Sequence, residues 1–136
     1  MAWKEYSYSN EWSGDHIMYR PIIGLELSHN EEHFSCIGLI DSGCDTTLIN
    51  AEIADALRID ISKCKKVKVS GIADKGIDSF TSTVNIKVEG FKDFLEMDVI
   101  FVPDMRFGAL LGQKDFFEKF KVKFEKKNKK FYLFQE

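Results

Sequence analysis

Alternating apolar and polar residues dominate the middle of this chain, and a two-residue period is typical of half-buried β-strands. In residues 80–88 the apolar side chains Val84, Ile86 and Val88 share one face, while the polar residues between them share the other. The same period continues through residues 95–101, and Pro103 follows this second segment. Because proline cannot donate to a strand ladder, we expect the strand to end there.

Further apolar segments predict additional strands, bounded by polar or glycine-rich turns. They comprise residues 21–27, 34–40, 65–69, 121–125 and 130–134.

Two segments have the spacing of short helices. Residues 51–57 follow Asn50, a residue type that commonly caps a helix N-terminus. Residues 113–120 carry three phenylalanines at helical spacing. Residues 1–20 are polar and aromatic without a clear period. The whole pattern predicts an all-β fold, a small barrel or sandwich, with two short helices.

The length and charge of the chain narrow the function classes. With 136 residues, the chain corresponds to one domain. Its net charge of −3 is uneven: residues 1–113 sum to −7 and residues 114–136 to +4. Nucleic-acid binding usually requires a basic stripe, but the arginines Arg20, Arg58 and Arg106 are scattered. We therefore expect no nucleic-acid partner.

Cysteine usage and hydropathy indicate the cellular setting. The cysteines are Cys36, Cys44 and Cys64, an odd number without a C-x-x-C pair, which argues against a disulfide framework and a structural zinc site. The N-terminus lacks an apolar signal core, and no apolar run approaches the roughly 18 residues that span a membrane. The expectation is a cytoplasmic protein without membrane association, metal or cofactor.

The sequence Asp41-Ser42-Gly43 carries the strongest chemical signal. It directly follows the predicted strand 34–40, so the carboxylate would sit on a rigid strand end and face a cleft. The Ser42 hydroxyl could hydrogen-bond to a neighbouring loop, and Gly43 permits a close backbone approach. Taken alone, Asp-Ser-Gly is a weak motif and is more typical of an ordinary turn that satisfies its own backbone.

Other candidate chemistries have weaker support. His29 and His33 fit the H-x-x-E-H zinc-protease pattern, but that pattern requires a helix and here lies between two predicted strands. A solvated loop is the better interpretation. Cys44 lacks an evident histidine base for nucleophilic catalysis. Asp41 lacks the second aspartate expected of a phosphotransfer site, because Gly43 occupies that position.

Four segments, taken in chain order, resemble the retropepsins, the single-domain aspartic proteases typified by retroviral proteases. This chain resembles a retropepsin-like protease of bacterial or archaeal type. The four segments are residues 20–24 (RPIIG), 37–49 (IGLIDSGCDTTLI), 69–80 (VSGIADKGIDSF) and 109–117 (ALLGQKDFF). The resemblance covers about residues 20–120. It implies a small closed β-barrel with a flap hairpin, formed by a domain at residues 20–136 that includes the C-terminal hairpin. Residues 1–19 would be an N-terminal extension of unknown role.

The resemblance also implies a catalytic site. Asp41 matches the catalytic aspartate, Ser42 matches the hydroxyl that braces the two active-site loops, and Gly43 matches the motif glycine. Carboxylate-driven peptide hydrolysis needs two carboxylates that share one proton. Since this chain offers one Asp-Ser-Gly, the second Asp41 must come from a second copy, and we expect a homodimer.

Substrate-binding residues follow from the same resemblance. Asp45 matches an aspartate that binds the substrate backbone, and Leu110 belongs to the apolar-apolar-glycine element behind the catalytic loop. Gly71, Ile72 and Ala73 resemble a flap tip, although the charged Asp74 and Lys75 beside them depart from a glycine-rich flap. The sequence thus predicts an aspartic endopeptidase acting on peptides or proteins. The alternative is a catalytically silent module of the same fold that binds peptides or assembles a complex.

Overall fold

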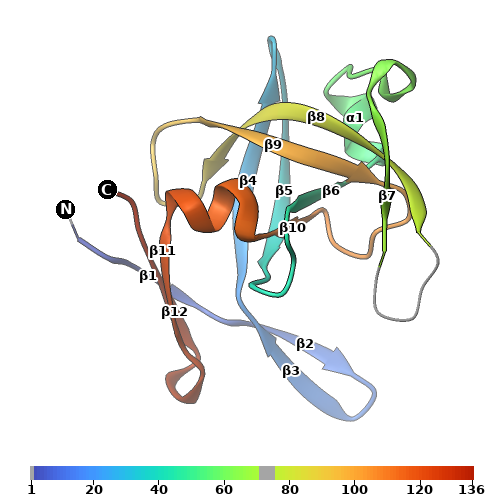
Figure 1. The fold of residues 1–136 in the computed structure, drawn as a ribbon. Helices are drawn as coiled ribbons and strands as arrows, with labels where there is room; N and C mark the ends of the chain where they lie inside the picture. The colour runs from blue at the N-terminus through green and yellow to red at the C-terminus, as the bar shows by residue number, and fades with distance from the viewer. Residues whose placement is uncertain (1, 71–75) are drawn as a thin grey trace.

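The computed structural model describes residues 2–70 and 76–136, which form mostly β-strands (Figure 1). In chain order the strands are β1 (Lys4–Ser7), β2 (Ser9–Ser13), β3 (His16–Arg20), β4 (Ile22–His29), β5 (Glu32–Ile40), β6 (Thr47–Asn50), β7 (Lys66–Val69), β8 (Ile77–Val88), β9 (Leu95–Val102), β10 (Ala109–Leu111), β11 (Lys121–Glu125) and β12 (Lys130–Phe134). The helical segments are α1 (Glu52–Ala56), η1 (Ile61–Lys63), η2 (Gln113–Phe117) and η3 (Lys126–Asn128).

Six strands close into a barrel. Their order is β4–β5–β10–β6–β9–β8, and β8 pairs back onto β4 with Leu25 opposite Val88. Closure leaves no open edge among these strands, which protects the sheet from pairing with other chains. The long strand β8 extends beyond the barrel and pairs there with β7. The prediction of an all-β fold with a small closed barrel is confirmed.

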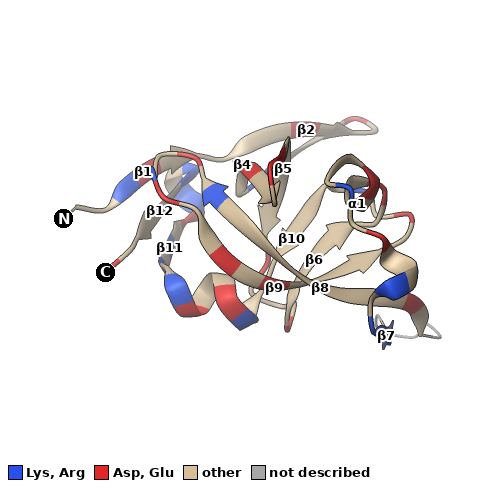
Figure 2. Cartoon of the chain, turned by 90° about the horizontal axis from the view of Figure 1, so that it is seen from above, with Lys and Arg blue, Asp and Glu red and all other residues tan. Residues whose placement is uncertain are grey.

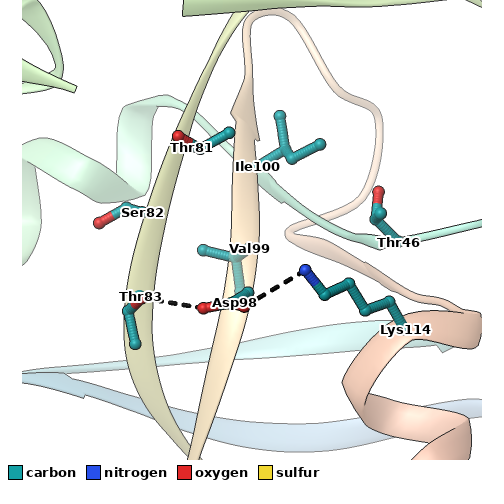
Figure 3. A pocket seen from close by; sticks show the side chains of 8 residues that line it. All are labelled: Thr46, Thr81, Ser82, Thr83, Asp98, Val99, Ile100 and Lys114. Atoms are coloured by element: carbon teal, nitrogen blue, oxygen red, sulfur yellow. Dashed lines mark hydrogen bonds and ion pairs between the residues drawn. The ribbon is translucent and has the colours of Figure 1, made fainter. Parts of the chain in front are cut away.

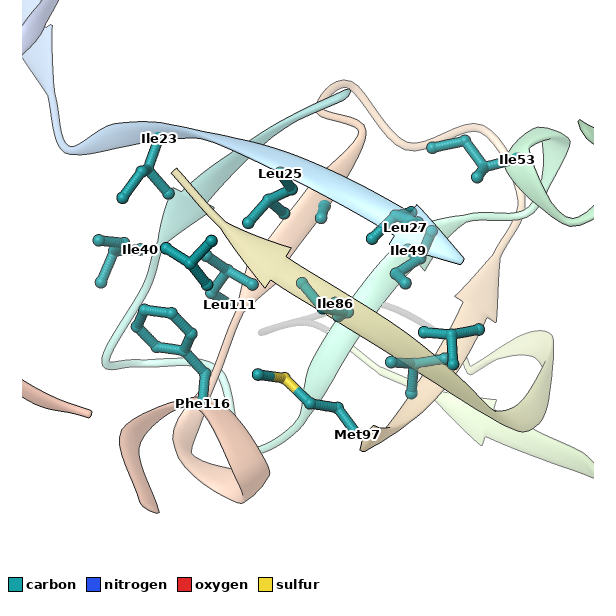
Figure 4. Packing of buried hydrophobic residues seen from close by; sticks show 14 of the residues in the cluster. Ile23, Leu25, Leu27, Ile40, Ile49, Ile53, Ile86, Met97, Leu111 and Phe116 are labelled. Carbon is teal, nitrogen blue, oxygen red and sulfur yellow. The ribbon is translucent and has the colours of Figure 1, made fainter. Parts of the chain in front are cut away.

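Apolar side chains fill the barrel interior, because every second residue of a strand points inward (Figure 4). In β8, Val84, Ile86 and Val88 are buried, as the alternation predicted. Strand β9 contributes Met97, Val99 and Phe101 in the same way. Burying one such side chain stabilises the fold by about 1.5–3 kcal/mol, so this interior is the main source of barrel stability.

A second sheet, β1–β12–β11, packs at the end of the barrel. It joins the two ends of the chain: Tyr6 of β1 lies opposite Phe131 of β12, and their rings stack with centroids 5.0 Å apart. Phe131 and Leu133 are completely buried in the common core. The C-terminal hairpin predicted at residues 121–134 is confirmed.

The N-terminal strands were not predicted. Strands β2 and β3 form a separate hairpin with Trp12 opposite Ile17, and both side chains are exposed. These strands lie largely at the surface, so their sequence carries no buried face and no apolar alternation.

Turns and helix ends differ from the predictions by a few residues. Strands β4 and β5 extend to a tight turn at residues 30–31, where Asn30 takes a φ of 54°. The segment between the predicted strands 21–27 and 34–40, expected to be a loop, is therefore mostly strand. Helix α1 is shorter than predicted. Its cap differs too: Asn50 Oδ1 accepts the Glu52 N–H at 3.0 Å, but Asn50 lies one residue before the helix cap position.

The lysines of residues 121–130 lie on β11, on the turn with η3 and at the start of β12, at the end of the molecule where both chain termini lie (Figure 2). Lys126 Nζ donates to the Tyr19 carbonyl at 3.1 Å, and the Lys129 ammonium lies 4.3 Å from the centre of the Tyr19 ring. Part of this charge therefore fastens the β11–β12 turn to β3. Within the described ranges, none of the helices has the length and apolar character needed to cross a membrane.

Candidate active site

Asp41 stands immediately after β5, where the protein holds both its backbone and its side chain. Its N–H donates to the Leu111 carbonyl of β10 at 2.9 Å, and its own carbonyl accepts the Cys44 N–H at 3.1 Å. Its carboxylate oxygen Oδ1 accepts the Gly43 N–H at 3.0 Å. The Gly43 N–H thus orients one oxygen of this half-buried carboxylate within the single chain.

The strand β10 explains why the Asp41 loop is rigid. β10 runs parallel to β5 and antiparallel to β6, so it lies between the two strands that the loop at residues 41–46 connects. The loop therefore wraps around the end of β10. At that point Gly112 passes so close that an added Cβ would lie 2.1 Å from the Thr46 carbonyl oxygen and 2.6 Å from that of Cys44. Only glycine fits this crossing.

Hydrogen bonds connect the residues after β10 to the loop and to Thr47, the first residue of β6. The Gln113 N–H donates to the Cys44 carbonyl at 2.8 Å, and the Gln113 side-chain Nε2 donates to the Ser42 carbonyl at 2.7 Å. The Lys114 N–H donates to the Asp45 carbonyl at 2.9 Å. On the other side, the Gly112 N–H donates to Oγ1 of the buried Thr47 at 3.3 Å.

Sequence analysis missed two of these positioning residues, Gln113 and Thr47. Both lie inside the segments that carried the resemblance, but nothing in residue type or spacing indicates that one will reach the other segment. Their roles depend on the β10 crossing, which brings together residues more than sixty positions apart in sequence.

Of the other predicted site residues, those that the structure describes lie on the Asp41 loop and on β10. Ser42, Gly43 and Asp45 are exposed on the loop around Asp41. At Gly43, an added Cβ would come within 3.3 Å of the Asp41 carboxylate, so close approach rather than an unusual φ favours glycine there. Leu110 is half-buried and lies on the opposite face of β10 from the fully buried Leu111.

The predicted flap tip, Gly71, Ile72 and Ala73, lies outside the described residues. The strands β7 and β8 that lead to it are described and pair from Lys66 opposite Phe80 to Val69 opposite Ile77.

Cys44 has the environment of a structural thiol. Its Sγ donates to the Thr46 carbonyl at 3.0 Å, and burial, reinforced by the charges of Asp41 and Asp45, raises the pKa of the thiol. A thiol with a raised pKa is a poor nucleophile at neutral pH. Cysteine chemistry at this loop is therefore disfavoured.

The histidine motif lies on the β4–β5 hairpin and not on a helix. His29 ends β4, and His33 in β5 has its Nδ1 2.9 Å from Glu26 Oε2. Across residues 2–70 and 76–136, no three His, Cys, Asp or Glu side chains gather closely enough to hold a metal ion.

Comparison with solved structures identifies this architecture. The crystal structure of a retropepsin-like aspartic protease from Rickettsia conorii superposes with a TM-score of 0.62, over 97% of this chain and 91% of that one, at 18% sequence identity. The chain has a retropepsin-like fold. At 18% identity the likeness establishes the fold alone.

The remaining comparisons add little. The EIAV protease complexed with the inhibitor HBY-793 aligns with 75% of this retropepsin-like chain and 86% of its own, at 20% identity and a TM-score of 0.42. No model of a protein family matches the sequence, and no curated protein matches it significantly.

Proposed function

We propose that this protein is a homodimeric aspartic endopeptidase whose active site forms from Asp41 of two copies. The observation that carries the proposal is the placement of Asp41 in a retropepsin-like fold, at a strand end and on a loop that β10 and Gly112 hold in place. A surface turn would not need this support from a crossing strand.

In the proposed mechanism, two Asp41 carboxylates face each other across a two-fold axis. Like charges about 3 Å apart cannot both ionise, so the pair shares one proton. The ionised carboxylate takes a proton from a water held between the two. The resulting nucleophile attacks the peptide carbonyl, while the protonated carboxyl gives its proton to the carbonyl oxygen. The carboxyl that took the water proton then gives it to the amide nitrogen, the C–N bond breaks and the amine leaves, and a hydroxyl proton of the intermediate returns to the carboxylate pair as the new carboxylic acid forms. The Gly43 N–H would keep each carboxylate oriented through this exchange.

The substrate would be an extended peptide lying between the Asp41 loops and the flaps. In this arrangement Asp45 binds the peptide backbone at either side of the catalytic pair, and Leu110 lines the cleft. Gly71, Ile72 and Ala73 would close over the peptide from the flap. Ser42 would brace the two loops against each other across the axis.

The deciding experiment compares wild-type protein with Asp41→Asn on a diverse peptide pool from about pH 4 to 7.5, with products read by mass spectrometry. Asp55→Asn is the matched control, since Asp55 is an exposed carboxylate of α1 outside the site. We expect cleavage by the wild type and by the control, and none by Asp41→Asn. Sizing chromatography of all three proteins at the assay concentration should give a dimer.

Absence of products from a wild-type dimer would refute the protease and favour a module that binds peptides without cleaving them. Equal cleavage by Asp41→Asn would place the chemistry elsewhere. Loss of the dimer in Asp41→Asn would mean that Asp41 is chiefly structural.

A further inference from the structure

A pocket of about 330 Å³ lies on the outer face of the barrel, between β8, β9 and the start of η2 (Figure 3). It is separate from the Asp41 carboxylate. Its walls carry Thr83 from β8, Asp98 and Ile100 from β9, Lys114 from η2 and Thr46 from the Asp41 loop. Sites for small ligands start at about 300 Å³, so this pocket is at the lower end of that range and has room for one amino-acid side chain.

An ion pair occupies one wall of this pocket. Lys114 Nζ lies 3.3 Å from Asp98 Oδ2, and Thr83 Oγ1 donates to Asp98 Oδ1 at 3.0 Å. The hydrogen bond from Thr83 makes the largest contribution, and that from Lys114 the next largest, to lowering the pKa of Asp98. This carboxylate therefore stays ionised in mildly acidic solution. Asp115 Oδ2 accepts the Asp98 N–H at 2.6 Å, which fixes the backbone that carries the pair.

The pair retains hydrogen-bonding capacity. A carboxylate offers about four acceptor positions and an ammonium three donors, and the bonds described use two of the former and one of the latter. More than half of the Asp98 and Lys114 side-chain surface is exposed, so a ligand can reach both.

The pocket is continuous with the Asp41 loop. Thr46 ends that loop and also lines the pocket, and the Lys114 N–H binds the carbonyl of the neighbouring Asp45 at 2.9 Å. A peptide that leaves the cleft past Asp45 would therefore meet this pocket next.

We propose that this pocket is a substrate subsite for the carboxamide side chain of glutamine or asparagine, at a substrate position remote from the scissile bond. The inference rests on the proposed peptidase function. The amide oxygen accepts from Lys114 while the amide nitrogen donates to Asp98, and Ile100 contacts the methylenes of the side chain. A carboxamide presents an acceptor and a donor side by side, as the ion pair presents a donor and an acceptor.

Charged side chains fit less well. A carboxylate would be attracted by Lys114 but repelled by Asp98 at nearly the same distance, with Asp45 adding repulsion from the loop. An ammonium would be attracted by Asp98 but repelled by Lys114. A neutral carboxamide uses both partners without this cancellation and without the cost of desolvating a full charge.

The test uses a peptide that the wild type cleaves. A single glutamine is moved along it through successive positions on each side of the scissile bond and compared with norleucine, glutamate and lysine at the same positions. At one remote position we expect kcat/KM for glutamine to exceed that for norleucine on the order of tenfold, as two modest hydrogen bonds provide. In Lys114→Met this ratio should fall to about 1. In Lys121→Met, a lysine at the start of β11 outside the pocket, it should stay as in wild type.

Higher kcat/KM for glutamate or lysine than for glutamine at that position would overturn the proposal, as would an unchanged glutamine ratio in Lys114→Met. If the wild type cleaves nothing, the peptidase fails, and the pocket is then tested alone. N-acetylglutamine amide is titrated into ¹⁵N-labelled protein, with N-acetylnorleucine amide as the control. Saturable shifts at the amides of Thr83, Asp98 and Lys114 with the glutamine compound only would support the pocket, and equal or absent shifts would reject it.

Discussion

Replacing Gly112 with alanine tests whether the crossing of β10 against the Asp41 loop is as the structure describes. The added Cβ would lie 2.1 Å and 2.6 Å from two backbone carbonyl oxygens, so the loop or the end of β10 must move. That movement breaks or lengthens the three backbone-donated bonds at the crossing, from Gly112, Gln113 and Lys114. Each such bond contributes about 0.5–1.5 kcal/mol, so we expect the free energy of unfolding to fall by about 3 kcal/mol.

The assay is urea unfolding followed by circular dichroism, at one protein concentration because a dimer's stability depends on concentration. Gly43→Ala is the matched control in the same loop, since its Cβ meets only the Asp41 carboxylate, at 3.3 Å. We expect this control to lose less, on the order of 1 kcal/mol, because only the Asp41 side chain must shift to admit the Cβ and no backbone group blocks it. If Gly112→Ala unfolds like wild type, the loop does not cross β10 as described, and the argument for a rigid Asp41 fails.

Three further predictions address other parts of the molecule. Phe116→Ala, which removes a fully buried ring stacked on Phe120, should lower the free energy of unfolding by about 3–5 kcal/mol, measured in the same assay. Burial, followed by the charge of Glu89, raises the pKa of Tyr6 to about 12, above the value of about 10 in an unfolded chain. The stabilisation by the neutral phenol is therefore complete below about pH 10 and is lost as the pH rises toward 12. The free energy of unfolding, measured against pH for both proteins, should be about 1 kcal/mol lower for Tyr6→Phe than for wild type at pH 7, and this difference should shrink above pH 10. Peptide cleavage should have an acidic-to-neutral optimum and fall when both carboxylates of the Asp41 pair ionise; a pH–rate profile with activity only at alkaline pH would contradict the shared-proton mechanism.

The short strands β6 and β10, which are largely buried, were not predicted. Much of the remaining fold could be predicted from sequence because most barrel strands have one buried and one exposed face. That geometry places apolar residues at every second position, as in β8 and β9, and the period is visible without knowing what each strand packs against. The same reasoning failed for β1 to β3, whose strands are mostly exposed. Exposed strands form through backbone pairing, which leaves little pattern in residue type.

In the candidate site, too, some features follow from the local sequence and others appear only in the folded chain. The sequence placed Asp41 at the end of a strand and marked the segment around Gly112, because both depend on local features: an apolar run, a turn and a glycine. It could not show that Gly112 must be glycine because two carbonyl groups of a distant loop lie against it. That requirement comes from the crossing and exists only once β10 lies between β5 and β6.

The sequence by itself predicted four of the six barrel strands, β4, β5, β8 and β9, and the position of Asp41 on a loop after β5. It also led to the expectation of a second copy, because carboxylate chemistry needs a pair. The tertiary structure decided which strands are neighbours, that the two chain ends share one sheet, and that Asp98 and Lys114 form a pocket beside the loop. The physical reason is the separation along the chain between the residues that interact. Side-chain periodicity reflects each residue's own burial, whereas strand order and long-range hydrogen bonds depend on contacts between residues far apart along the chain, and a single sequence does not display those pairings.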